Sequence, residues 1–360
     1  MHQGSICPAK AQLLLKNKNL NIKNLLKYLL TFLITAGALY LAFHGQDFAA
    51  IGDQLSHASL WAIALSVLFQ IVAHFIRSWR WQFLLRPIKE RTSLWIAFKA
   101  VMAGYAMNNV IPRSGELIRP AMASVQENMP FAGTLATIIV ERIFDVIALG
   151  SLFVFSLFNY EKEFRSAFPD LSGAAIPLLI VVSAGLIIFV VIFISKPVSD
   201  FFLRLINNIF PKKIGDPLAK AFRTFTTGLH GLQRDTALPI LFGTIGVWAS
   251  YAASTYFSIY ALPGSGIEFI GLKGAIVLLA LSGIAMTIPT PGGTGTYHYF
   301  ISQALILFFG INASSAIAFA TVTHAANYIV ITVAGLFFMF SAGVSLIAVR
   351  KQEETVQVTK

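Results

Sequence analysis

The sequence predicts an all-α polytopic membrane protein, built as an inverted repeat with about six full spans and two re-entrant helical hairpins. The 360-residue chain is 56% hydrophobic and only 12% charged, whereas soluble domains carry about 25% charged residues. Several apolar runs reach the roughly 20 residues that cross a bilayer. Two stretches with proline and glycine interrupt such runs, one in each half of the chain.

The distribution of basic residues predicts the topology of the first half. A basic tail, residues 1–24, precedes a first span at about residues 25–43, and the next loop has no lysine or arginine. A second span at about residues 60–76 returns to a basic segment, and a third at about residues 131–158 leaves it again. Residues 92–130 therefore cross an even number of times. We expect a re-entrant hairpin there, because non-helical backbone at membrane depth needs protein or water around it.

The second half repeats this plan in the opposite orientation. A span at about residues 174–194 leads to a basic segment, residues 196–236, with an amphipathic helix expected on the cytoplasmic membrane surface. A span at about residues 238–262 goes outward, and a last span at about residues 316–347 ends at a basic pair inside the cell. Between them, residues 275–310 form the second predicted hairpin.

These segments give a simple domain organisation. A cytoplasmic tail is followed by two membrane repeats of opposite orientation and a second cytoplasmic tail, at residues 1–24, 25–158, 174–348 and 349–360. The interrupted stretches also align with each other. Gly104, Ala106, Met107 and Pro112 recur, half a chain later, as Gly283, Ala285, Met286 and Pro291. Inverted repeats with broken helices are a transporter architecture.

Few charged residues are forced to membrane depth. They are Arg113, Glu116 and Arg119 at the first hairpin, then Glu141, Arg142 and Asp145 on the following span. A charge at this depth costs about 3 kcal/mol, so it faces a cavity or a partner. Two interpretations stay open. The arginines hold a lipid phosphate in a cavity where carboxylates exchange protons, or an ion-pair network closes the hairpin against the span.

The remaining candidate residues also allow two interpretations each. Pro291, Gly292, Gly293 and Gly295 turn the backbone tightly and either offer N–H groups to an anion or form a simple turn. His298 and His324 are proton or ligand sites, or hydrogen-bonded core histidines. Arg77 and Arg80, among tryptophans, anchor the interface or bind a headgroup.

Several functions are not expected. The net charge of +11 follows from positive-inside topology and contact with anionic headgroups, so nucleic acid is not an expected partner. The single cysteine, Cys7, offers neither a disulfide nor a cysteine-rich metal site. We find no catalytic motif and no metal-ligand spacing, and expect no catalytic residue, metal or cofactor.

Four motifs carry a resemblance to a known family. They are Arg-Ser-Trp-Arg-Trp at 77–81, Pro-Arg-Ser-Gly-Glu-Leu-Ile-Arg at 112–119, Glu-Arg-Ile-Phe-Asp at 141–145 and Pro-Gly-Gly-Thr-Gly at 291–295. In this order the sequence resembles the lysylphosphatidylglycerol synthase transmembrane-region family, also called flippase-like or UPF0104 membrane proteins. The resemblance covers roughly residues 25–348.

The resemblance implies lipid translocation. In longer members of that family, the membrane region precedes a soluble domain that aminoacylates phosphatidylglycerol, and the membrane part is thought to flip the product. Archaeal members join a similar region to a glycosyltransferase. This chain matches the membrane part, which argues against lipid aminoacylation. It also has His298 where many members have an acidic residue, which leaves room for a different headgroup choice or coupling.

The leading hypothesis is therefore a flippase-like transporter, not an enzyme, that moves an anionic phospholipid or a polyprenyl-phosphate lipid between leaflets. It is expected in the cell (inner) membrane as a multi-pass protein with both termini cytoplasmic. One alternative is a scaffold or partner of a separately encoded synthase or glycosyltransferase. Another is a membrane-embedded enzyme that acts on lipid headgroups. The sequence leaves the oligomeric state open.

Overall fold

The computed structural model describes residues 22–167, 183–184, 196–209 and 234–342. Within these ranges all regular elements are helical, as the sequence predicted. Two described helices, α4 (Leu60–Leu85) and α15 (Ala313–Ser341), are long and apolar enough to cross a membrane. A third span results if α2 and α3, bent by 86° at their break, are counted together. The other predicted spans stay predictions, and the one at residues 174–194 lies outside the described ranges.

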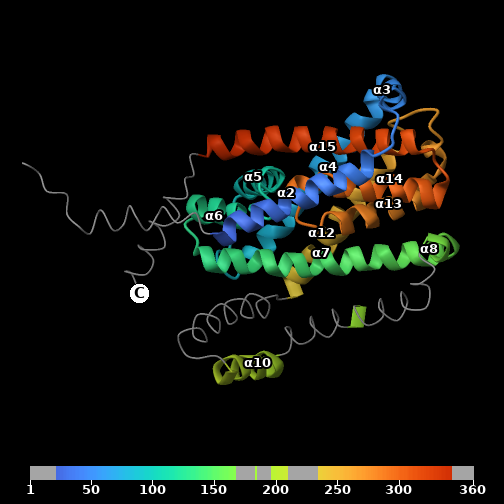
Figure 1. Cartoon of the computed structure of the whole chain (residues 1–360). Coiled ribbons are helices and arrows are strands. Elements are labelled where there is room, and N and C mark those ends of the chain that lie inside the picture. The colour runs from blue at the N-terminus through green and yellow to red at the C-terminus, as the bar shows by residue number, and fades with distance from the viewer. Residues whose placement is uncertain (1–21, 168–182, 185–195, 210–233, 343–360) are drawn as a thin grey trace, which may run out of the picture.

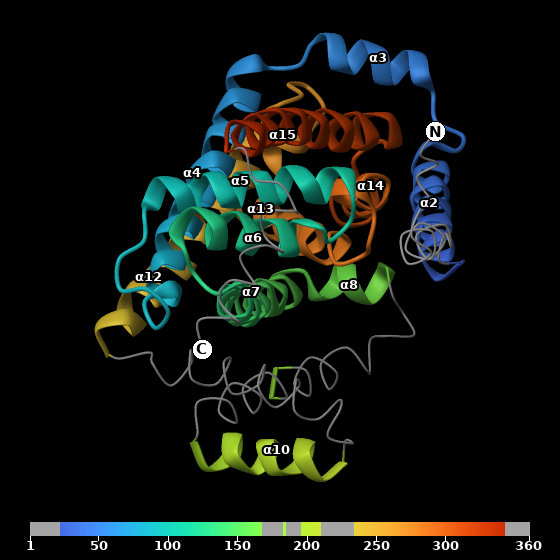
Figure 2. The same cartoon turned by 90° about the vertical axis from the view of Figure 1, so that its left-hand side faces the viewer.

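The N-terminal part consists of α2 (Ile22–Phe43) and the short helix α3 (Phe48–Ser56), which the sequence analysis treated as a loop. Asp47 caps α3, because its carboxylate accepts hydrogen bonds from the N–H groups of Ala49 and Ala50 at 2.9 and 3.1 Å. Figure 2 shows α3 across the top, beside α15, and α2 at the right, beside α14.

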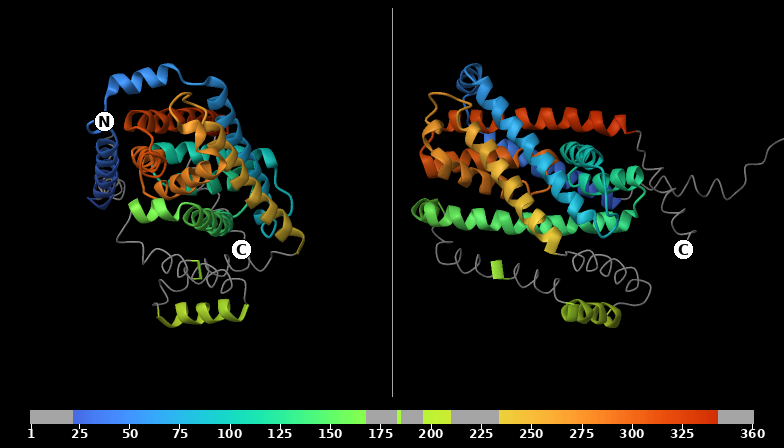
Figure 3. Two further views of the ribbon diagram at one scale, coloured as in Figure 1. Left: turned by 90° about the vertical axis from the view of Figure 1, so that its right-hand side faces the viewer. Right: turned by 180° about the vertical axis from the view of Figure 1, so that it is seen from behind.

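Helices α4 and α12 (Arg234–Ser258) run side by side along much of their length (Figure 3). Small residues on α12 allow this close approach. Gly243 lies directly against the side-chain carbons of Arg80, and Ser254 Oγ donates to Ser66 O at 2.8 Å. The helix that carries the second predicted span continues beyond residue 76 to Leu85, and the arginines in this extension are buried with partners.

The two segments predicted as hairpins each form a pair of packed helices. The first pair is α5 (Leu94–Val110) and α6 (Gly115–Glu127), and the second is α13 (Gly271–Ala285) and α14 (Thr296–Phe309). Both pairs lie between α15 and the long helix α7 (Phe131–Asn159) (Figure 1). In the first pair, α5 packs on α15 and α6 on α7. In the second, α13 packs on α7 and α14 on α15.

Glycines bring these helices into backbone contact. A Cβ on Gly115 would overlap the carbonyl of Gly104, so the two helices of the first pair touch where α6 begins. A Cβ on Gly335 would likewise overlap the carbonyl of Met102, so α15 lies directly on α5. Close approach through small residues is a common way for membrane helices to associate.

The remaining described elements are short. They are α8 (Glu161–Ala167), α10 (Lys196–Ile209), and the 3-10 turns η2 (Ile267–Phe269) and η3 (Pro291–Gly293). In α10, Phe201 and Leu205 are exposed apolar residues four positions apart, as in an amphipathic helix. The rest of the predicted amphipathic segment, residues 210–233, lies outside the described ranges.

Replacing Gly335 by alanine should destabilise the protein by about 1–3 kcal/mol, because the added methyl group collides with α5 backbone. The measurement is thermal unfolding of the purified protein in detergent. Gly150→Ala in α7 is the matched control. Apart from the neighbouring backbone of α7, no atom of the described residues lies within 4 Å of the Cβ position at Gly150, so the melting temperature of this variant should not fall. Equal melting temperatures for the two variants would contradict this contact.

Candidate functional site

Charged side chains from three helices meet inside the bundle. Glu141 and Asp145 lie one turn apart on the same face of α7. Arg77 and Arg80 extend from α4, and Arg119 extends from α6. All five are buried, and Glu141 is fully inaccessible. We call these five residues the ionic network.

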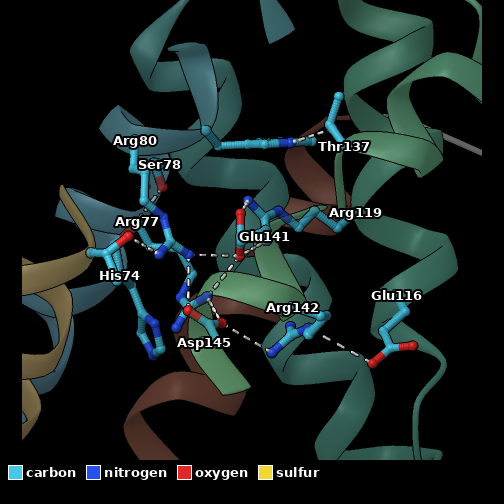
Figure 4. Close-up of polar contacts among 12 residues, drawn as sticks. His74, Arg77, Ser78, Arg80, Glu116, Arg119, Thr137, Glu141, Arg142 and Asp145 are labelled. Atoms are coloured by element: carbon cyan, nitrogen blue, oxygen red, sulfur yellow. Dashed lines mark hydrogen bonds and ion pairs between the residues drawn. The ribbon is translucent and has the colours of Figure 1, made fainter. Parts of the chain in front are cut away.

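Figure 4 shows how the arginines surround the two carboxylates. Arg119 binds Glu141 through both terminal nitrogens, each at 2.8 Å. Arg77 Nη1 donates to Glu141 Oε1 at 2.7 Å and to Asp145 Oδ2 at 2.5 Å. Arg80 Nη2 donates to Asp145 Oδ1 at 3.0 Å. Each buried charge therefore has an opposite charge at hydrogen-bond distance, which offsets its loss of hydration.

Neighbouring side chains hold the arginines in place. Trp81 stacks its ring 4.0 Å from the guanidinium carbon of Arg119, and its Nε1 donates to Thr137 Oγ1 at 2.8 Å. Arg80 Nη1 donates to Thr244 Oγ1 at 2.9 Å, which links the network to α12. The network therefore ties together α4, α6, α7 and α12.

Two further charges lie at the edge of this network. The side chains of Glu116 and Arg142 are 45% and 39% exposed. Arg142 Nε lies 3.9 Å from Glu116 Oε1, and Arg142 Nη1 lies 3.5 Å from Asp145 Oδ2. Both residues line a narrow cleft of about 10 Å³, roughly the space of one water molecule, which Gly104, Tyr105, Asn108 and Arg119 also line. We call it the α5–α7 cleft, after the first and last helices that line it.

The turn of the first helix pair forms one end of this cleft. Asn108 Oδ1 accepts a hydrogen bond from the N–H of Gly115 at 2.7 Å, across the turn. Arg113 adopts a positive φ of 63°, and its Nη2 donates to Thr287 O at 3.1 Å. Arg113 therefore connects the first turn to the second helix pair and does not join the ionic network.

The turn of the second pair meets α5 and α15. Gly292 has a φ of 53°, and a Cβ there would collide with Asn109 and Tyr328. Its carbonyl oxygen accepts a hydrogen bond from His324 Nε2 at 2.9 Å. Tyr328 OH donates to Asn109 O at 2.8 Å, and Asn109 Nδ2 donates to Thr332 Oγ1 at 2.7 Å. The two turns and α15 thus form one polar junction.

The other predicted residues of the second turn make contacts within the protein. Pro291 begins η3, and the N–H of Gly293 donates to Thr290 O at 3.3 Å. The N–H of Gly295 donates to His298 Nδ1 at 3.4 Å, and the His298 ring lies 4.8 Å from that of His324. Both histidines therefore lie beside the second turn, and neither belongs to the ionic network of α4, α6 and α7.

Only part of this arrangement was predicted from the sequence. The sequence predicted one group of charges, of which Arg113 lies apart, and it placed Arg77 and Arg80 at the membrane interface or on a headgroup. The predicted group is Arg113, Glu116, Arg119, Glu141, Arg142 and Asp145. A signal for the burial of Arg77 and Arg80 is their i,i+3 spacing, which puts both on one helix face. The prediction also missed Asn109 and Tyr328, whose contact joins residues 219 positions apart. It missed His74 as well, which is buried against Tyr105 with both ring nitrogens unpaired among the described residues.

Metal binding has no evident site in this part of the chain. No group of three or more His, Cys, Asp or Glu side chains suited to a metal ion occurs among the described residues. The carboxylates that do cluster, Glu141 and Asp145, are occupied by arginines.

Comparison with known proteins identifies the family. The profile described as the lysylphosphatidylglycerol synthase TM region matches residues 28–335. The chain belongs to this family. The four motifs that carry the resemblance lie within the matched range. Three of them supply the ionic network: residues 77–81 contain its two α4 arginines, residues 141–145 contain its two carboxylates, and residues 112–119 end in Arg119. No solved structure matches the chain significantly.

Two curated relatives of this family member are archaeal. The glycosyltransferase AglD of Haloferax volcanii is 21% identical over 348 residues, which cover 87% of this chain and 54% of that protein. The UPF0104 membrane protein MJ1595 of Methanocaldococcus jannaschii is 23% identical over 295 residues, 77% of this chain and 83% of that protein. The chain thus spans about half the length of AglD.

Replacing Glu141 by glutamine should strongly destabilise the protein, by about 3–5 kcal/mol, because it leaves buried arginines without their counter-charge. Thermal unfolding in detergent measures this loss. Glu161→Gln provides the matched control, because Glu161 pairs with Arg165 at an exposed position and should have little effect. If both variants unfolded at the same temperature, the network would not hold the helices together.

Proposed function

We propose that this protein moves a phospholipid or a polyprenyl-linked lipid between the two leaflets of the cell membrane. The observation that carries this proposal is the α5–α7 cleft. It is a narrow opening beside the turn of a helix pair, within an apolar helical bundle, and three charged residues, Glu116, Arg119 and Arg142, are among those that line it.

Lipid movement between leaflets is limited by the polar headgroup, because charged groups enter the hydrocarbon region at high cost. A cleft with charged and amide side chains replaces part of the water that the headgroup loses. The acyl chains meanwhile stay in the bilayer. A transporter of this kind needs a polar surface at membrane depth and helices that surround it without closing it off.

The packing of the helix pairs supports the inverted-repeat architecture that we propose for the chain. The second helix of each pair packs on the long helix that follows it in sequence, α6 on α7 and α14 on α15. The first helix of each pair packs on the long helix of the other half, α5 on α15 and α13 on α7. Two inverted halves that exchange contacts in this way are suited to alternating access between the two sides.

We further propose that both termini are cytoplasmic and that the first and second helix pairs enter from opposite sides. The basic segments after α4 and before α12 support this orientation. Both helix pairs would then meet at the polar junction of Asn109, Gly292 and Tyr328, and this junction would lie between the two sides.

The relative AglD supports a second candidate role. AglD is named a glycosyltransferase, and this chain matches 54% of its length. A membrane region that is joined to an enzyme in one protein can work beside a separately encoded enzyme in another. In that role the protein would present a lipid to a partner that modifies its headgroup.

Lipid translocation can be measured with purified protein in liposomes that contain tail-labelled phosphatidylglycerol, using a quencher that reaches only the outer leaflet. We expect movement above that of empty liposomes. Glu116→Trp should reduce it to the background, because the ring would fill the mouth of the α5–α7 cleft.

The control for this experiment is Glu161→Trp, which places the same ring at an exposed position on α8, where a carboxylate also pairs with an arginine. It should translocate lipid like the unchanged protein. Absence of movement with all lipids, in protein that remains folded, would contradict transport and favour the partner role.

A further inference from the structure

The arginines near the α5–α7 cleft differ in how their donors are used. Arg77, Arg80 and Arg119 each donate hydrogen bonds to a carboxylate of the ionic network. Arg142 makes no hydrogen bond to any residue in the described ranges. It is therefore the arginine of this group whose terminal nitrogens make no hydrogen bond to a described residue, which leaves them available to another molecule.

The surroundings of Arg142 differ from those of the other three arginines at the terminal nitrogens. Its Nε is buried and has no hydrogen-bond partner in the described part of the chain. Its two neighbouring carboxylates, Glu116 and Asp145, approach to 3.9 and 3.5 Å, which is longer than a charge-assisted hydrogen bond. The Nε of Arg77, Arg80 and Arg119 is likewise buried without a partner in the described ranges, so the terminal nitrogens are what set Arg142 apart.

Glu116 is the counterpart of Arg142 across the cleft. It lies in the first turn of α6, where the helix dipole favours a negative charge even without a paired cation. Its side chain is about half exposed and accepts no hydrogen bond from another described residue. A carboxylate in this position can leave Arg142 without becoming a buried unpaired charge.

The charges of this region do not balance. Four arginines, Arg77, Arg80, Arg119 and Arg142, face three carboxylates, Glu116, Glu141 and Asp145. The region therefore carries one excess positive charge beside an opening. An anion that binds there would neutralise it, whereas a cation would add to it.

We propose that Arg142 binds the phosphate of a lipid headgroup and that Glu116 is its resident counter-anion, which the phosphate displaces. This assignment rests on the proposed function and adds the class of substrate, a phosphate ester. The planar guanidinium of Arg142 can donate from Nε and one terminal nitrogen to two phosphate oxygens. Glu116 then turns to solvent, and its return to Arg142 releases the lipid.

The proposal predicts opposite effects for the two residues. Glu116→Gln removes the competing anion and should tighten binding of a phosphate ester about tenfold. Arg142→Gln removes the site and should weaken binding by about tenfold or more. Arg142→Lys keeps the charge without the paired donors and should fall between them. A role in folding alone would not make the glutamate variant bind more tightly.

The experiment is a binding titration of the full-length protein in detergent, by calorimetry, with two probes in separate arms. One probe is short-chain phosphatidic acid and the other is inorganic phosphate. The proposal is supported if phosphatidic acid binds more tightly to Glu116→Gln, and more weakly to Arg142→Gln, than to the unchanged protein. This holds whether or not inorganic phosphate also binds. Binding of inorganic phosphate alone would overturn the assignment to a lipid.

Matched variants keep this test decisive. Glu161→Gln removes an exposed carboxylate paired with Arg165, away from the cleft, and should leave binding unchanged. Because Glu116 and Arg142 are both partly exposed, their variants should remain folded, and thermal unfolding checks this. Equal affinities of the unchanged protein and Glu116→Gln, or of the unchanged protein and Arg142→Gln, would overturn the proposal.

Failure of this inference is separable from failure of the proposed function. If the protein moves lipid in liposomes but its variants bind phosphatidic acid with equal affinity, the proposal of lipid transport stands. The proposal that a phosphate displaces Glu116 is then wrong. If the variants show the predicted order of affinities but no lipid moves, the phosphate site at Arg142 is supported and transport is not. That result would favour a protein that presents lipid to a partner.

Discussion

The fold depends on the carboxylate of Glu141. It is fully buried on α7 and receives hydrogen bonds from Arg77 of α4 and Arg119 of α6. In an apolar bundle, van der Waals packing alone distinguishes poorly between alternative helix arrangements, because lipid tails pack against helices as well. A buried charge with partners on other helices permits only arrangements that bring all of them together. The ionic network therefore fixes which helices meet.

This constraint also explains why the α5–α7 cleft can stay open. Every member of the ionic network has a partner of opposite charge within the network, and both terminal nitrogens of Arg119 bind Glu141, although its three arginines outnumber its two carboxylates. Glu116 and Arg142 lie outside that closed set and are held only by longer contacts. The structure thus separates a rigid set of charges, which positions the helices, from a loosely paired set that faces the opening.

The sequence predicted the helical class, the two interrupted segments and the charges of the first hairpin, because a charge or a Pro-Gly-Gly run within apolar sequence is locally visible. It did not predict that Arg77 and Arg80 are buried, because arginines among tryptophans at the end of an apolar run look the same whether they face headgroups or carboxylates. It also missed the contact of Asn109 with Tyr328. Such pairs depend on the tertiary fold, and neither residue is distinctive in its own segment.

The order of the charged helices in the chain has a consequence for biosynthesis. Both α4 and α6 precede α7, so their arginines emerge from the ribosome before the carboxylates that neutralise them. Until α7 arrives, these side chains must reach for water or lipid phosphates at the membrane surface, as long basic side chains do. Membrane integration of the first half is therefore completed only by its last helix. A nascent chain that stops before Glu141 would leave these arginines at the membrane without their counter-charges, and we expect quality-control proteases to degrade it.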